Sequence, residues 1–169
     1  MLTRIGDLTR LSNYLAGQLK SAVAITGGTI AGVSLTGSSV AVTAGLTSSG
    51  STGAGIGYAA GAGGAVTQAT NRTTGVTLSK LAGQITTNNA SLAAEASANF
   101  TVTNTTVSIG DVVVVSIQSG SNGGNTAVSV VTVADGSFVI KVSNNNAAAG
   151  TAETGAIIIN FAVIKSVAA

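Results

Sequence analysis

Hydrophobic and small polar residues alternate through the second half of the chain. Between Phe100 and Val142, 21 of 43 residues are Val, Ile or Thr, which are residue types that suit a pleated, half-buried surface. Turn-forming residues divide this region, and Asp135-Gly136 in particular favours a hairpin. Seven strands are predicted: Gly75–Ser79, Gln84–Thr87, Ala98–Asn104, Asp111–Gln118, Asn125–Val133, Ser137–Ser143 and Ala156–Lys165. This spacing indicates a mainly β fold with a C-terminal sandwich of two antiparallel sheets, of jelly-roll or Ig-like kind.

Two of these segments are apolar on both faces. In Val112–Val115 and Ile157–Ile164, large apolar side chains point to either side of the strand. One face can fill the core, and the other would be exposed in a monomer, as is typical of an interface. A strand central to a larger core has the same pattern. We expect a trimer whose β-domain contacts include Val113, Val115, Ile158 and Ile164.

Residues 1–23 show helical spacing instead of alternation. Their leucines recur at intervals of three and four, and Asp7 suits an N-cap. A helix this short is marginal in water by itself, so the apolar stripe needs a partner. That partner is either the chain's own C-terminal domain or a surface outside the chain, namely another copy or a larger particle. In the second case the anchoring residues are Arg4, Leu8, Arg10, Leu11, Leu15 and Leu19.

Residues 24–64 form a glycine-rich middle region before a C-terminal domain of residues 65–169. In its first part, apolar residues alternate with small polar ones. Strands so short and glycine-rich cannot stand alone, so this part predicts a fibre-like shaft in which several chains wind together. The residues expected on the trimer axis are Ile25, Ile30, Val33 and Leu35. A flexible Gly/Ser linker is the alternative, and the sequence after Thr47 favours it.

Charge is sparse along the 169 residues. Seven Lys and Arg stand against five Asp and Glu, and residues 23–71 carry no charge at all. The cations are scattered singly, whereas a nucleic-acid-binding protein clusters them on one face. No run of about 20 apolar residues is present for a membrane-spanning helix. We therefore expect neither a nucleic acid nor a membrane as a partner.

The residue types that usually carry catalysis are missing or dispersed. The chain has no His and no Cys, which removes imidazole bases, thiol nucleophiles and the usual zinc ligands. Its five acids are far apart in sequence: Asp7, Glu95, Asp111, Asp135 and Glu153. The glycine clusters at 53–57 and 61–64 lack the Gly-Lys-Ser/Thr ending of a phosphate-binding loop. We predict no catalytic residue, no metal, no cofactor and no enzymatic activity.

Three segments carry a resemblance to a known family. They are Gly57–Lys80, which contains Gly-Gly-Ala-Val-Thr-Gln, followed by Gly83-Gln-Ile-Thr86 and the closing Asn160–Lys165. Together they resemble the C-terminal module of small head-fibre and capsid-decoration proteins of tailed bacteriophages, a module also found in some tail-associated proteins. The resemblance implies a homotrimer on the virion without catalysis, and it leaves attachment to head or tail open. Between these two locations we expect the capsid surface.

Two functions follow as expectations. In the first, the N-terminal segment binds the major capsid protein and the chain projects a trimeric head fibre or knob. In the second, the chain is a tail-fibre or adhesin module that binds a host cell-surface glycan through loops such as Ser119–Asn125 and Asn144–Thr151.

Overall fold

The computed structural model describes residues 56–58 and 61–166, and this part of the chain is all-β. The predicted helix within residues 1–23 lies outside the described residues, as does most of the predicted shaft at 24–64. The strands are β1 (Ala65–Thr67), β2 (Val76–Thr77), β3 (Ala82–Thr86), β4 (Ser97–Thr103), β5 (Val112–Ser119), β6 (Thr126–Ala134), β7 (Ser137–Asn144) and β8 (Ile158–Ile164). No helix in this part is long and apolar enough to cross a membrane.

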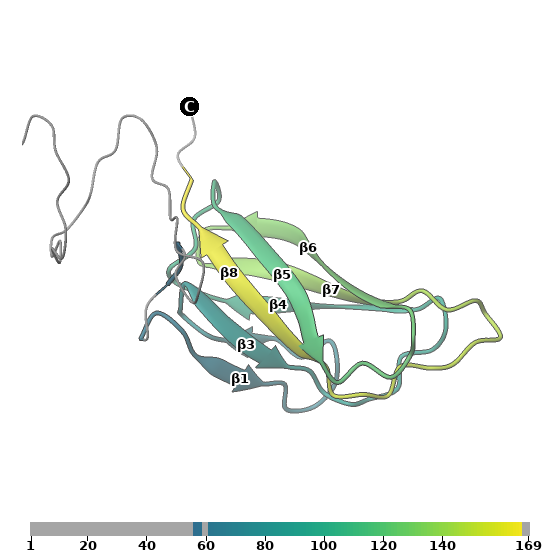
Figure 1. Cartoon of the computed structure of the whole chain (residues 1–169). Helices are drawn as coiled ribbons and strands as arrows, with labels where there is room; N and C mark the ends of the chain where they lie inside the picture. Colours follow the sequence, from purple (N-terminus) through teal and green to yellow (C-terminus); the bar gives the residue numbers. More distant parts are fainter. Residues whose placement is uncertain (1–55, 59–60, 167–169) are drawn as a thin grey trace, which may run out of the picture. The chain divides into compact units, whose positions relative to one another are not determined.

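The strands form two four-stranded sheets, ordered β1-β3-β8-β5 and β2-β4-β7-β6 (Figure 1). Both sheets are mixed, because β1 runs parallel to β3 and β2 runs parallel to β4, while the other neighbours are antiparallel. The prediction of purely antiparallel sheets is therefore wrong. Residues 68–81 join β1 to β3 and include β2 of the other sheet, and residues 78–96 join β2 to β4 and include β3. Each connection thus crosses to the other sheet and returns to the end at which the first strand began, so the next strand of the same sheet runs parallel to the first.

Seven of the eight strands correspond to predicted segments, with ends that differ by a few residues. The β6–β7 hairpin turns at Asp135-Gly136 as predicted: Ala134 pairs with Ser137, and Gly136 has a φ of 76°, a value that favours glycine. Strand β1 was not predicted. Its three residues carry too short a pattern to be distinguished from the neighbouring glycine-rich sequence.

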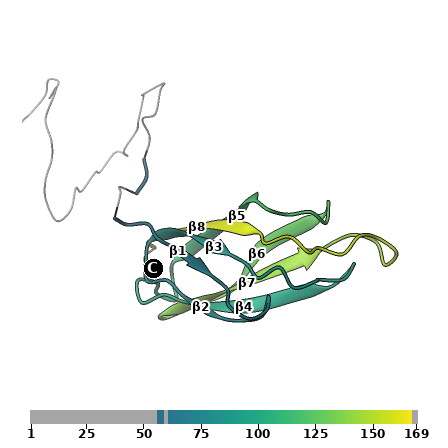
Figure 2. The same cartoon turned by 90° about the horizontal axis from the view of Figure 1, so that it is seen from below.

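The core lies between the two sheets, which Figure 2 shows as separate layers. Side chains alternate strictly between core and surface along β4 and β7. The rings of Phe138 and Phe161 meet across the layers with centroids 5.4 Å apart, a favourable distance for an aromatic pair. Gly83 has no room for a side chain, because a Cβ there would collide with Leu78 and Phe161.

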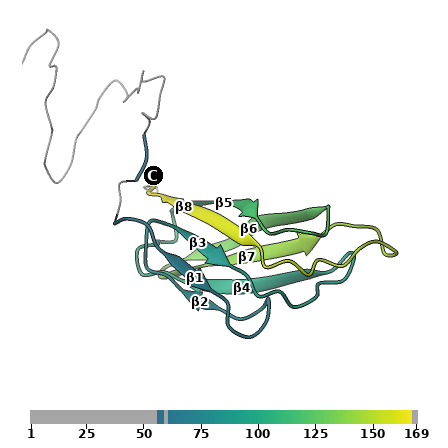
Figure 3. The ribbon, with the colours of Figure 1, turned by 60° about the horizontal axis from the view of Figure 1, so that its bottom comes forward.

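The two ends of the domain differ in their connections (Figure 3). We call one the proximal end, because the described chain starts there at Ile56–Tyr58 and finishes there after Ile164; it also carries the connection 104–111 and the turn at Asp135-Gly136. The opposite, distal end carries the connections 68–75, 87–96, 120–125 and 145–157.

Candidate self-association surface

The residues predicted as trimer contacts fall on different sides of the sheet. Val113 is 8% exposed and belongs to the core, and Val115 packs against that core. Both point inward because β5 pairs with β8 in a register that places them opposite Val163 and Phe161, which are core residues themselves. The prediction of Val113 and Val115 as surface contacts is thus corrected: the outward residues of β5 are its other valines.

The predicted residues of β8 do lie on the outward side. Ile158 is half-buried, and Ile164 is 55% exposed. The remaining predicted contacts at Ile25, Ile30, Val33 and Leu35 lie outside the described residues. The predicted anchoring residues between Arg4 and Leu19 lie outside them as well.

An apolar patch occupies the proximal half of the outer face of the β1-β3-β8-β5 sheet. We call it the proximal patch and define it by Ile56, Tyr58, Val112, Val114, Ala162 and Ile164. Val112 pairs with Ile164 and Val114 pairs with Ala162, so these four side chains form two adjacent rows. Val112 is 52% exposed and Val114 is 50% exposed. No member of the patch carries a charge.

The start of the described chain completes the patch and encloses a cavity in it. Ile56, Gly57 and Tyr58 lie with Ala162 and Ile164 around a space of about 440 Å³. The hydroxyl of Tyr58 donates a hydrogen bond to the backbone carbonyl of Val163, which fastens this stretch to β8. Sequence patterns did not point to Ile56, because the surrounding glycines are typical of a linker.

Polar groups bound the patch on two sides. Toward the distal end the outer face turns polar, and the Gln84 amide donates to the Gln118 side chain at 2.8 Å. At the proximal edge Lys165 and the buried carboxylate of Asp111 form an ion pair at 2.5 Å. The hydrogen bond from Lys165, with one from the Ser108 amide, lowers the pKa of Asp111. The patch is therefore a limited apolar area with a polar border.

The distal end is organised around one buried carboxylate. Glu153 is fully buried, and its oxygens accept hydrogen bonds from Ser121 Oγ at 2.7 Å and Thr126 Oγ1 at 2.5 Å. Backbone amides also donate to it, from Gly123 at 2.9 Å and from Gly155 at 2.7 Å. Burial alone would raise the pKa of Glu153, but the hydrogen bonds outweigh it and lower the pKa to about 2.

Arg72 fastens further backbone to the same end. Its guanidinium donates to the carbonyls of Ala90 at 2.5 Å and Gly155 at 2.8 Å, and to the carbonyl of Glu153 at 3.2 Å. Burial lowers the pKa of Arg72, and the charge of Glu153 opposes that shift. No buried side-chain nitrogen or oxygen of the described residues lacks a hydrogen-bond partner. The cluster is thus saturated, and it holds the distal connections together instead of presenting a reactive group.

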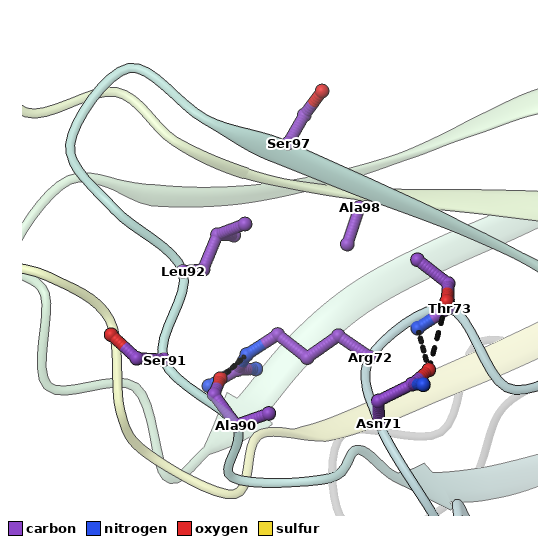
Figure 4. Close-up of a pocket in the computed structure, with 8 residues that line it drawn as sticks. All are labelled: Asn71, Arg72, Thr73, Ala90, Ser91, Leu92, Ser97 and Ala98. Atoms are coloured by element: carbon purple, nitrogen blue, oxygen red, sulfur yellow. Dashed lines mark hydrogen bonds between the residues drawn. The ribbon is translucent and has the colours of Figure 1, made fainter.

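A shallow cavity of about 310 Å³ lies beside Arg72 (Figure 4). The carbonyl oxygen of the Asn71 side chain is occupied, because it accepts hydrogen bonds from the amide and the hydroxyl of Thr73. Arg72 extends toward Ala90, and Leu92 and Ala98 supply apolar wall. The side chains of Asn71, Arg72 and Thr73 are thus engaged within the protein, and the hydroxyls of Ser91 and Ser97 are the other polar side-chain groups of the lining.

The acids of the described region lie at both ends of the domain. Glu153 is at the distal end, whereas Asp111 and Asp135 accept hydrogen bonds from the neighbouring amides of Ser108 and Ile109 at the proximal end. Residues 56–58 and 61–166 contain no group of three or more His, Cys, Asp or Glu arranged to hold a metal. Among the described surfaces, the proximal patch gathers most of the large hydrophobic side chains that face solvent.

Comparison of the chain with protein-family models, with curated proteins and with solved structures gives no match.

Proposed function

We propose that the protein is a non-enzymatic structural component of a tailed-bacteriophage particle. In this proposal it decorates the capsid as a homotrimer, binds the major capsid protein through residues 1–23 and projects its β domain outward. The resemblance of Gly57–Lys80 and Asn160–Lys165 to phage head-fibre and decoration modules supports this function. The observation that carries it is the proximal patch.

The patch favours self-association on simple energetic grounds. Exposed aliphatic side chains gain free energy when they leave water, at about 25 cal/mol per Å² of apolar surface buried. Clusters of such side chains on soluble proteins are typical of interaction sites. A surface without charge offers nothing to attract an oppositely charged partner, but identical copies can meet on it without repulsion. The partner in this proposal is therefore the same chain.

The N-terminal segment supplies the attachment. Its leucine stripe, with Arg4 and Arg10, holds apolar and cationic groups that have no counterpart in the uncharged sequence that follows. Helices of this size gain their stability from packing and not from propensity. Burial against the capsid would meet that need.

A second function is kept because the structure brings the two candidate adhesin loops together. At the distal end, opposite the proximal patch, the Asn125 amide donates to the Asn146 side chain at 3.2 Å. A host glycan would be contacted there by exposed amide and hydroxyl groups. We rank this function lower, because the side-chain amides of Asn122 and Asn146 already donate hydrogen bonds to the Thr154 hydroxyl and the Thr151 carbonyl.

The test uses the purified full-length chain and capsids that lack it. Native mass measurement should give three copies, and added protein should occupy the capsids. A chain shortened to residues 24–169 should remain an oligomer and lose attachment. A monodisperse full-length monomer would overturn the homotrimer, and undiminished attachment of the shortened chain would overturn the proposed anchor.

A further inference from the structure

We infer that each copy inserts Ile109 into the cavity of the proximal patch of the next copy, so that three copies close a ring. The inference rests on the proposed homotrimer and adds the residues that form its contact. Its starting point is the geometry of a ring. Copies related by a three-fold axis use two different surfaces, one from each neighbour. A ring therefore needs a projecting feature on one side of the chain and a receiving feature on the other.

The receiving feature is the cavity of about 440 Å³ that Ile56, Gly57, Tyr58, Ala162 and Ile164 enclose. Its walls are aliphatic and aromatic, and the hydroxyl of Tyr58 is already engaged with the Val163 carbonyl. Among the described residues, no charged side chain lines it. A site of this chemistry accepts an aliphatic side chain and gains nothing from a polar or charged one.

The projecting feature is Ile109, at the same end of the domain. It is 70% exposed, the largest exposure among the large hydrophobic residues that the structure describes. It does not line its own cavity. Apart from the patch residues, Val131 is the other large hydrophobic residue exposed in the described part, at 47%. Val131 lies within β6, in the edge strand of the other sheet and beside a bulge, and it projects from no loop.

The loop that carries Ile109 is held in place. The Ile109 amide donates to Asp135 Oδ1 at 2.9 Å, and the Ser108 amide donates to Asp111 Oδ2 at 2.8 Å. The Asp111 amide closes the turn by donating to the Ser108 carbonyl at 2.9 Å. A side chain presented on a fixed loop loses little conformational entropy when it binds, which favours affinity.

The length and composition of the preceding chain support a second copy as the occupant. The 55 residues before Ile56 lead directly into the cavity wall, and residues 23–55 of that stretch carry no charge. Copies joined at this cavity bring three such starting points close to one axis. Residues 23–55 add no like charges there, and Lys165, which follows Ile164 of the cavity wall, is paired with Asp111. An unrelated partner in the cavity would not bring residues 23–55 of a second copy close to those of the first.

The test exploits the absence of cysteine from the natural sequence. Two full-length variants, Ile109→Cys and Ile56→Cys, carry different affinity tags, are co-expressed and are treated with a short thiol-specific crosslinker. The main crosslinked species should contain one chain of each tag, because only neighbouring copies can join the two. The matched control replaces Ile109→Cys by Val131→Cys, and it should give little of the mixed species.

A second measurement uses substitutions. Ile109→Asp should weaken trimer formation by about tenfold or more, as expected for a central contact residue, whereas Val131→Asp should leave it unchanged. Trimers by native mass without the Ile109–Ile56 link would overturn this contact while the proposed function stands. Links between two Ile109→Cys chains alone would also overturn it. A monomer at every concentration would overturn the homotrimer, and the contact with it.

Discussion

The proximal and distal ends of the β domain differ in which side chains they bury and which they expose. At the distal end, polar groups are taken into the interior and fully satisfied: Glu153 and Arg72 bind backbone and hydroxyl groups from several connections. At the proximal end, aliphatic groups are left on the surface: Val112, Val114 and Ile164 are each at least half exposed. One end satisfies its buried polar groups within the chain, and the other exposes aliphatic side chains to solvent.

This difference between the two ends indicates which of them can interact with a partner. A buried carboxylate that receives several hydrogen bonds leaves no capacity for a partner, so the distal end gains order at the expense of reactivity. An exposed aliphatic surface retains its free energy of burial until a partner covers it. Substitutions at the distal end should therefore change folding, while substitutions at the proximal end should change assembly.

The largest effect is expected at Glu153. Glu153→Ala removes the acceptor for several buried donors and leaves Arg72 without a nearby countercharge, so the free energy of unfolding should fall by about 3–5 kcal/mol. Urea unfolding followed by circular dichroism measures this change. The matched control is Glu95→Gln at an exposed acid of the distal connections, which should change stability by less than about 0.5 kcal/mol. Equal losses of unfolding free energy at Glu153 and Glu95 would show that the buried carboxylate is no more important for stability than an exposed one.

The second prediction concerns the proximal end. Val114→Lys places a charge in the uncharged patch and should weaken trimer formation by at least about 2 kcal/mol. The fold should be retained, because the side chain is half exposed in the single chain. Sedimentation across a concentration series measures assembly, and circular dichroism reports on folding. Ala127→Lys, at an exposed position of the other sheet opposite the uncharged Ser143, is the control and should assemble normally. Unchanged assembly of Val114→Lys would remove the patch from the interface.

The third prediction is a loss of stability in acid that originates at the distal end. The folded-state pKa of Glu153 is about 2, below its ordinary value of 4.5, so its contribution is present above pH 4.5. That contribution should disappear as the pH falls from 4.5 toward 2. It amounts to about 1–2 kcal/mol after solvent screening. Urea unfolding measured over this range should show a steeper decline for the natural chain than for Glu153→Gln.

The pKa of Asp111 is also lowered, so its contribution to stability also falls as the pH decreases. Asp111→Asn therefore serves as the second control. If Glu153→Gln followed the natural chain through the whole range, the distal carboxylate would not be the source of the acid sensitivity.

The smallest effect is expected at Lys165. The Lys165 side chain is 51% exposed, although the Asp111 carboxylate that it pairs with is buried. Because water solvates the ammonium group, we expect the ion pair to contribute little to stability. Lys165→Gln should therefore shift the urea midpoint less than any change above, and added salt should abolish the remaining difference. The Asp111 carboxylate keeps its hydrogen bond from the Ser108 amide in this variant. A loss of stability comparable to that of Glu153→Ala would mean that the ion pair of Lys165 and Asp111 also stabilises the proximal end strongly.

Much of the β domain was predictable from the sequence because its strands obey local rules. Phe100 and Val102 alternate with polar residues, which predicts the strand β4, and the structure buries this alternating set of side chains. The β6–β7 hairpin follows from Asp135-Gly136, since glycine accepts the positive φ that the turn requires. The two-sided apolar character of β5 and β8 was also visible, and with it the expectation that some apolar surface stays uncovered.

Which side of β5 stays uncovered was decided only in three dimensions. Four consecutive valines have no polar residue to mark the outward face, so Val112 and Val113 are equivalent until the register with β8 orients them. The association of Arg72 with Glu153, 81 residues apart, likewise depends on connections that meet at the distal end. Strand β1 exists because β3 pairs with it, and not because its three residues favour a strand. Local pattern determined the elements, whereas strand pairing decided which side chains face the core, solvent or one another.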